Sequence, residues 1–176
     1  FNPKHVEAYY SRALAKAHRS LGQLDQAAAC LEEALHLEPR RVEWQNELGL
    51  IYQMQGKERE ALVSFTLAAE REPTVAAYHR NAGNILEQLG RFEEAAQQLR
   101  QAVQLMPDKA AWRLELAGVL EQLGLYEEAL NEYKRAEELD AREAQAPLRK
   151  GRVLRWVERY DEAVLAVGHA LELEPE

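Results

Sequence analysis

The chain has 176 residues, a hydrophobic fraction of 47% and a formal net charge of −8 at pH 7. This apolar content is enough for a packed core, and the acidic excess argues against a surface that attracts nucleic acid or anionic lipid. A single cysteine, Cys30, excludes an intramolecular disulfide and a multi-cysteine metal site. No apolar run approaches the ~18 residues that a transmembrane helix needs.

Small residues recur along the chain at a fixed interval of 34 residues. Two columns of alanine keep this interval: Ala27, Ala61, Ala95, Ala129 and Ala163, and Ala34, Ala68, Ala102, Ala136 and Ala170. Pro39, Pro73 and Pro107 keep it as well. Such a period is typical of a stack of identical supersecondary units, and this length holds about five of them. It favours a binding scaffold over an enzyme.

Within each repeat, apolar residues recur every three or four positions, which predicts helices. In chain order the pattern predicts ten helices and no strand: residues 7–20, 24–37, 42–55, 58–71, 76–89, 92–105, 110–123, 126–139, 144–157 and 160–173. Glycine marks the turn inside four of the helix pairs, at Gly22, Gly56, Gly90 and Gly124. Glu158 takes that place in the last repeat, which is therefore expected to be the most irregular.

A further column of small residues lies in the first helix of each pair: Ala15, Gly49, Gly83, Ala117 and Gly151. Small side chains allow the two helices of a pair to approach closely, and large residues should fill the facing spaces. The expected large residues are Leu14, Leu48 and Leu116 in one column, and Leu31, Phe65, Leu99, Tyr133 and Val167 in another.

These columns resemble the tetratricopeptide repeat, a helix–turn–helix unit with the pattern W-x2-L-G-x2-Y…A-x3-F…P. The second repeat shows the pattern best, with Leu48-Gly49-x2-Tyr52, Ala61-x3-Phe65, Ala68 and Pro73. The resemblance covers about residues 6–176 and implies an all-α, right-handed superhelical α-solenoid. A single array is expected over residues 1–176, as a fragment of a longer repeat protein whose sequence style is similar to bacterial members. Its expected repeats are about 6–41, 42–75, 76–109, 110–143 and 144–176.

In this family the first helix of each pair lines a concave groove that usually holds a peptide from a partner. The resemblance implies four groove positions in each first helix, and these hold six basic and three acidic residues, a net +3 against −8 for the chain. A basic lining should attract an acidic segment, although arginines placed for solubility would give the same pattern. The candidate peptide-binding residues are Tyr9, Arg12, Lys16, Arg19, Asn46, Leu50, Gln53, Arg80, Asn84, Leu114, Arg149, Arg152 and Arg155.

Two specialised binding modes of the family are not expected. Some members bind the C-terminal carboxylate of chaperones with a clamp of basic residues and asparagines, and Arg80, Asn84 and Arg149 match three of its positions. At another position Glu115 replaces an asparagine, and its charge would repel a carboxylate. Gln145 replaces a lysine of the same clamp. Other members use an asparagine at one position of every repeat. The corresponding column here reads Ala13, Glu47, Asn81, Glu115 and Arg149.

No catalytic or nucleotide-binding motif is present, and the five histidines lack metal-ligand spacing. The expected protein is therefore not an enzyme and has no cofactor; its partner is a protein or peptide with an acidic segment, with no nucleic acid and no membrane insertion. Two alternatives stay open: self-association through the terminal repeats, with the apolar face of residues 160–173, and a scaffold arm of a larger enzyme or bacterial envelope or secretion complex. The cytoplasm is the default location, and the periplasm applies to an envelope protein.

Overall fold

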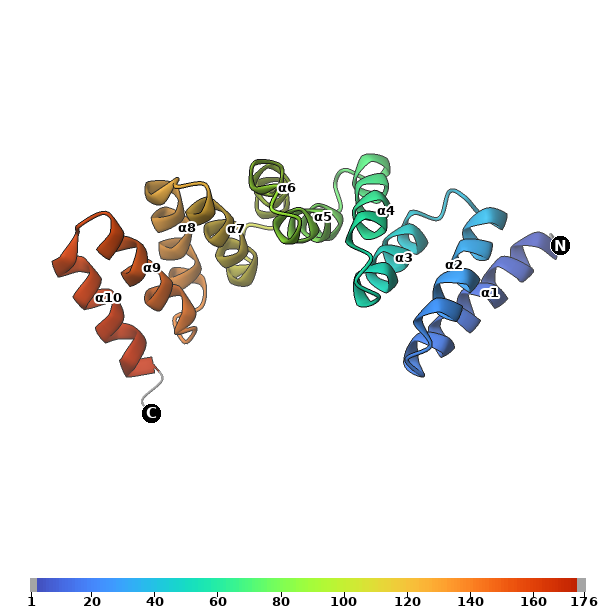
Figure 1. Cartoon of the computed structure of the whole chain (residues 1–176), viewed down its shortest axis with the longest axis horizontal. Helices are drawn as coiled ribbons and strands as arrows, with labels where there is room; N and C mark the ends of the chain where they lie inside the picture. Colours follow the sequence, from blue (N-terminus) through green and yellow to red (C-terminus); the bar gives the residue numbers. More distant parts are fainter. Residues whose placement is uncertain (1–2, 174–176) are drawn as a thin grey trace. The chain divides into compact units, whose positions relative to one another are not determined.

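A computed structural model describes residues 3–173, and these residues form ten α-helices and no β-strand (Figure 1). The helices are α1 (Pro3–Ser20), α2 (Leu24–Leu37), α3 (Val42–Met54), α4 (Glu58–Arg71), α5 (Ala76–Gln88), α6 (Phe92–Leu105), α7 (Ala110–Gln122), α8 (Tyr126–Leu139), α9 (Gln145–Trp156) and α10 (Tyr160–Leu173). The predicted all-α fold is confirmed, and the predicted bounds of α2 to α10 agree to within one residue at each end. Helix α1 begins four residues before the predicted start, at Pro3, because proline suits the first position of a helix.

The chain divides into two compact units, Phe1–Leu89 with α1 to α5 and Gly90–Glu176 with α6 to α10. In the first unit α1 packs on α2, α2 on α3, α3 on α4 and α4 on α5. In the second unit α6 packs on α7, α7 on α8, α8 on α9 and α9 on α10. Contacts between helices that follow one another in sequence are typical of a solenoid. None of the helices described has both the length and the apolar character needed to cross a membrane.

The predicted columns of small and large residues form the core of both units. Both alanine columns are buried, and Leu31, Phe65, Leu99 and Tyr133 are fully buried against them. A Cβ added at Gly49 would lie 2.6 Å from the Phe65 ring, and one at Gly151 would lie 2.6 Å from Val167 Cγ2. The glycines are therefore needed where a large residue of the second helix meets the backbone of the first.

The packing prediction was wrong for Leu14. Its side chain is 53% exposed, whereas Leu48 and Leu116 at the equivalent positions are 6% and 3% exposed. Helices α3 and α7 are covered by the second helix of the preceding repeat, α2 and α6 respectively. No helix precedes α1 within residues 3–173, so the same residue type at the same repeat position faces solvent.

The turns inside the helix pairs share one backbone conformation. Gly22, Gly56, Gly90 and Gly124 have φ between 70° and 73°, and Glu158 has φ 62°. This left-handed region suits glycine, whereas a side chain there costs roughly 1–2 kcal/mol. The fifth repeat therefore keeps the geometry of the other turns and accepts strain at Glu158, and the irregularity expected of this repeat is not seen in its turn.

Proline carbonyls in two of the links between repeats are held by the helix that follows. Arg113, nearly buried, donates to the carbonyl oxygen of Pro107 from Nε at 3.0 Å and from Nη2 at 2.8 Å, and to Glu132 Oε2 at 2.6 Å. His79, in the equivalent position of α5, places Nε2 3.0 Å from the carbonyl oxygen of Pro73. These contacts fix where a first helix begins, and so where its side chains are presented.

Two glycines of the last helix pair give a matched test of close packing. Gly151→Ala should lower the free energy of unfolding by about 1–3 kcal/mol, because the new Cβ meets Val167 and the carbonyl oxygen of Ala163. Gly168→Ala should raise it by about 0.5–1 kcal/mol, because nothing lies within 4 Å of the new Cβ and alanine favours helix. Urea denaturation of both variants measures the effects, and equal shifts would contradict the packing argument.

The strain at Glu158 is tested by exchanging residues between two turns. Glu158→Gly should stabilise the chain by about 0.5–1 kcal/mol, since relief of the left-handed strain exceeds the entropy that glycine adds to the unfolded chain. Gly124→Glu, the control at φ 71°, should destabilise it by a similar amount. Thermal unfolding followed by circular dichroism reports both changes, and a destabilised Glu158→Gly variant would refute the argument.

Candidate functional site

Candidate residues link the first helices of neighbouring repeats in the N-terminal unit. Arg12 on α1 donates from Nε and Nη2 to the two carboxylate oxygens of Glu47 on α3, at 3.1 and 2.5 Å. Asn81 on α5 donates from Nδ2 to Asn46 Oδ1 on α3 at 2.9 Å. Both pairs are separated by 35 residues, one repeat plus one position. Polar pairs therefore link α1 to α3 and α3 to α5, and we call these side chains the polar row.

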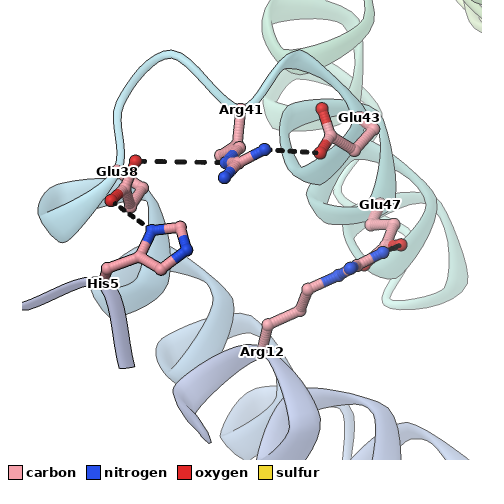
Figure 2. A network of polar contacts seen from close by, with 6 residues as sticks. All are labelled: His5, Arg12, Glu38, Arg41, Glu43 and Glu47. Atoms are coloured by element: carbon pink, nitrogen blue, oxygen red, sulfur yellow. Dashed lines mark hydrogen bonds and ion pairs between the residues drawn. The ribbon is translucent and has the colours of Figure 1, made fainter. Parts of the chain in front are cut away.

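Charges around α1 are organised into a local network, shown in Figure 2. Glu47 holds Arg12 through both oxygens and also lies 3.9 Å from Lys16 Nζ. The positive charge predicted for the groove is therefore partly balanced by Glu47, which stands outside the four groove positions of α3. The excess of positive charge along the first helices is smaller than those positions alone indicate.

A second set of polar contacts in Figure 2 joins the loop between α2 and α3 to α1 and α3. Arg41 lies 3.9 Å from Glu38 and 3.9 Å from Glu43, and Glu38 also lies 2.9 Å from His5 Nδ1. One arginine thus ties the end of the second helix of a repeat to the start of the next first helix. Glu43 is one of the three acidic residues at the groove positions, and Arg41 partly balances its negative charge.

Two aromatic rings lie beside these charges. Tyr9 and Trp44 meet edge to face with ring centroids 5.2 Å apart. The guanidinium carbons of Arg12 and Arg41 lie 5.5 and 5.6 Å from the Trp44 ring, within the range of cation–π attraction. Trp44 is fully buried, whereas Tyr9 is 40% exposed. The exposed part of Tyr9 is an aromatic surface next to arginines, suited to a peptide side chain.

In the C-terminal unit, Glu121 on α7 is the centre of a second cluster. Its side chain is 2% exposed, accepts a hydrogen bond from the Tyr133 hydroxyl and lies 2.9 and 3.1 Å from Arg152 Nη2. Burial, and secondly the bond to Glu121, raise the pKa of Tyr133 above its ordinary value. The carboxylate thus joins α7, α8 and α9.

Arginines of α9 lie around this cluster. A Cβ added at Gly118 would lie 3.5 Å from Arg149 Nη1, so Arg149 extends over α7. The guanidinium carbon of Arg152 lies 5.4 Å from the Trp156 ring. Arg152 and Arg155 also line a pocket of about 670 Å³ between α9 and α10. The three candidate cations of this unit, Arg149, Arg152 and Arg155, therefore lie on one helix.

The candidate residues are accessible to different degrees, and none is buried. Tyr9, Lys16, Arg152 and Arg155 are exposed, while the remaining nine are partly exposed: Arg12, Arg19, Asn46, Leu50, Gln53, Arg80, Asn84, Leu114 and Arg149. The structure brings Tyr9, Arg12 and Lys16 together, and likewise Arg149 and Arg152. Leu50 packs against the core around Phe65 and Ile85, which gives it a structural role. Asn84 Oδ1 is buried and has no hydrogen-bond partner among the described residues.

Sequence reasoning missed Glu47 and Glu121 as the carboxylate partners of arginines, and it missed the loop arginine Arg41. A usable signal existed for Glu47, because a residue in a first helix contacts the residue 35 positions later. No comparable signal exists for Arg41, whose contacts depend on the path of a loop. Among residues 3–173, no group of three histidine, cysteine, aspartate or glutamate side chains could hold a metal ion.

The buried Tyr133–Glu121 bond predicts a pH effect on stability. Because the pKa of Tyr133 is raised in the folded state, its contribution is complete below the unfolded tyrosine pKa of about 10 and is lost as pH rises above it. Tyr133→Phe should cost about 1–2 kcal/mol at neutral pH and lessen the decline above pH ~10. Denaturant unfolding at several pH values measures this. Tyr10→Phe, at an exposed tyrosine, is the control, and identical pH profiles would contradict the prediction.

Comparisons with known proteins agree with the repeat architecture. Family models described as tetratricopeptide repeat and TPR repeat match residues 55–110 and 80–147, and residues 15–56, respectively. A search of curated proteins found no match.

Several solved structures resemble this chain. A crystal structure of MamA protein is 22% identical with a TM-score of 0.92, covering 96% of this chain and 92% of that chain. A MamA from Desulfovibrio magneticus RS-1 is 18% identical with a TM-score of 0.90, covering 96% of each. YrrB, described as a TPR protein with an unusual peptide-binding site, is 22% identical with a TM-score of 0.85, covering 94% of this chain and 86% of that chain. At these identities the likeness concerns the fold.

The family matches extend over more than half of the chain, and the structure within them consists of helices whose small and large columns pack as the repeat requires. The chain therefore belongs to the tetratricopeptide-repeat family.

Proposed function

We propose that this chain is a non-catalytic protein-interaction scaffold, a single array of five repeats over residues 1–176, that binds an acidic or extended peptide segment of a partner along its first helices. The supporting observation is that each unit carries accessible polar, basic or aromatic side chains on its first helices: Tyr9, Lys16 and Asn46 in the N-terminal unit and Arg152 in the C-terminal unit. A peptide-binding site is also named for the similarly folded YrrB.

Carboxylates of the chain itself compete with an acidic peptide for the basic side chains. Arg12 already has a bidentate partner in Glu47, and Arg152 donates from Nη2 to both carboxylate oxygens of Glu121. A peptide carboxylate gains most from cations that are accessible and loosely held. Lys16 fits this description, because its side chain is 52% exposed and its nearest carboxylate oxygen, on Glu47, is 3.9 Å away. Binding should be of moderate strength and weakened by salt.

The state of the titratable groups supports binding over catalysis. Tyr52, which is partly buried, and Tyr133, which is fully buried, have raised pKa values because desolvation and hydrogen bonds to carboxylates disfavour the tyrosinate form. The pKa of Glu137 is lowered, with its hydrogen bonds to Lys150 and His169 outweighing burial. A carboxylate with a lowered pKa and hydrogen bonds to Lys150 and His169 is a weak base, better suited to holding helices together than to proton transfer.

Self-association is a second candidate, favoured by apolar side chains exposed at both terminal helices. Tyr10 and Leu14 on α1 are 69% and 53% exposed, and Val164 and Leu171 on α10 are 72% and 62% exposed. Equivalent positions in inner repeats are mostly buried. Another copy of the chain could cover these residues, and so could a partner of different sequence.

Peptide binding is tested with a short fluorescein-labelled peptide of alternating glutamate and alanine, followed by fluorescence anisotropy. Affinity should fall as salt rises. Lys16→Glu and Arg152→Gln should each weaken binding by about 0.5–1 kcal/mol, roughly two- to fivefold. Lys134→Glu is the matched control, since Lys134 is exposed on the second helix α8. The proposal is wrong if the peptide does not bind, or if all three variants bind like the parent chain.

A further inference from the structure

The pocket between α9 and α10 is almost entirely apolar and open to solvent. Its volume is about 670 Å³, and its lining includes Leu148, Tyr160, Val164, Val167 and Leu171, with Arg152 and Arg155 contributed by α9. The most exposed apolar side chains of the lining belong to α10, where Val164 and Leu171 are mostly accessible. No helix within residues 3–173 follows α10. A contiguous apolar surface of this kind is typical of an interaction site.

Most positions equivalent to these residues are covered by a helix in other repeats. Val164 corresponds to Ala28, Ala96 and Leu130, and Leu171 corresponds to Leu35, Ala69 and Val103, all of which are buried. The remaining equivalents are partly buried: Leu62, and Glu137, which contacts Lys150 of α9 at 2.9 Å. Helix α2 shows how the burial arises: Ala28 and Leu35 form one core cluster with Trp44 and Leu48 of α3. The face of α10 therefore has the chemistry of a surface that receives a first helix, whose apolar residues would lie over Val164 and Leu171.

The arginines at the pocket edge specify the charge of that helix. In the preceding pair of first helices, Glu121 on α7 meets Arg152 on α9 at 2.9 Å. The residue of α9 equivalent to Glu121 is Arg155, 34 positions later. A helix seated on α10 as α9 is seated on α8 would thus place its residue equivalent to Arg152 opposite Arg155. A carboxylate at that position would repeat the Glu121–Arg152 pair with the charges exchanged.

We propose that the α9–α10 pocket binds an acidic amphipathic helix of a partner protein, a proposal that rests on the scaffold role described above. The helix lays its apolar face on Val164 and Leu171 and directs a carboxylate at Arg155. A second copy of the chain fits less well, because its first helix α1 carries Lys16 at the position equivalent to Arg152. Lys16 would then oppose Arg155, and the two positive charges would repel each other. Charge complementarity therefore favours a different, acidic partner.

The probe is a helix that already packs in this way elsewhere in the chain. A fluorescein-labelled peptide with the sequence of α3, Val42–Met54, carries Leu50 at the position equivalent to Arg152. Two versions are compared, one with Leu50→Glu and one with Leu50→Lys. The glutamate version should bind the chain on the order of tenfold more tightly by fluorescence anisotropy. Arg155→Glu in the chain should reverse this preference.

Two neighbouring positions on α10 supply a matched pair of variants. Val164 lines the pocket and Leu165 does not, although their side chains are 72% and 74% exposed. Residues equivalent to Leu165 are exposed in every other repeat: Ala29, Val63, Gln97 and Asn131. Val164→Glu should weaken binding of the glutamate peptide at least tenfold, by placing a charge under its apolar face. Leu165→Glu should leave binding unchanged, and circular dichroism shows that both variants are folded.

The outcomes separate this inference from the proposed function. Binding of the extended acidic peptide that responds to Lys16→Glu, without binding of either helical peptide, would retain the scaffold role and overturn the pocket assignment. Helical peptides sensitive to Val164→Glu, without binding of the extended peptide, would retain the pocket and overturn the groove proposal. Equal effects of Val164→Glu and Leu165→Glu would refute the pocket. Sedimentation of the chain alone that shows oligomers abolished by Val164→Glu would make a second copy the occupant and refute the acidic partner.

Discussion

The close approach of helices at columns of small residues is the constraint on which the other features depend. A side chain added at Gly49 or Gly151 would overlap Phe65 or Val167, so the two helices of these pairs have one spacing. Repeating this contact every 34 residues places successive first helices in a constant relation within each unit. Arg12 therefore meets Glu47, and Asn46 meets Asn81, at the same separation in sequence. The polar row follows from the apolar packing beneath it.

Polar contacts between first helices, in each unit separately, both join the repeats and limit what they can bind. Glu47 and Glu121 satisfy arginines that would otherwise be available to a ligand. A partner must therefore offer carboxylates in places where the internal ones do not reach, near Lys16 or Arg155, or compete directly for Arg12 and Arg152. This arrangement favours discrimination by position over strong attraction to any acidic chain.

The terminal helices show that burial depends on neighbours and not on residue type alone. Leu14 and Val164 lie at repeat positions whose inner equivalents are mostly buried, yet both are exposed. At α10 the result is an exposed apolar surface with the positive charge of Arg155 at its edge. Comparison with the other repeats indicates which face of a bound helix would be apolar and where its carboxylate would lie.

The sequence by itself determined the helices, their turns, the buried columns and the family, because these depend on a local periodicity that recurs in each of five 34-residue repeats. It also located the candidate side chains, whose accessibility follows from their place on a helix. Only the tertiary structure decided how charge is balanced, because Glu47, Arg41 and Glu121 act across helices and loops through the positions of their side-chain atoms. It likewise showed which equivalent residues are covered, since exposure at α1 and α10 depends on whether a neighbouring helix is present.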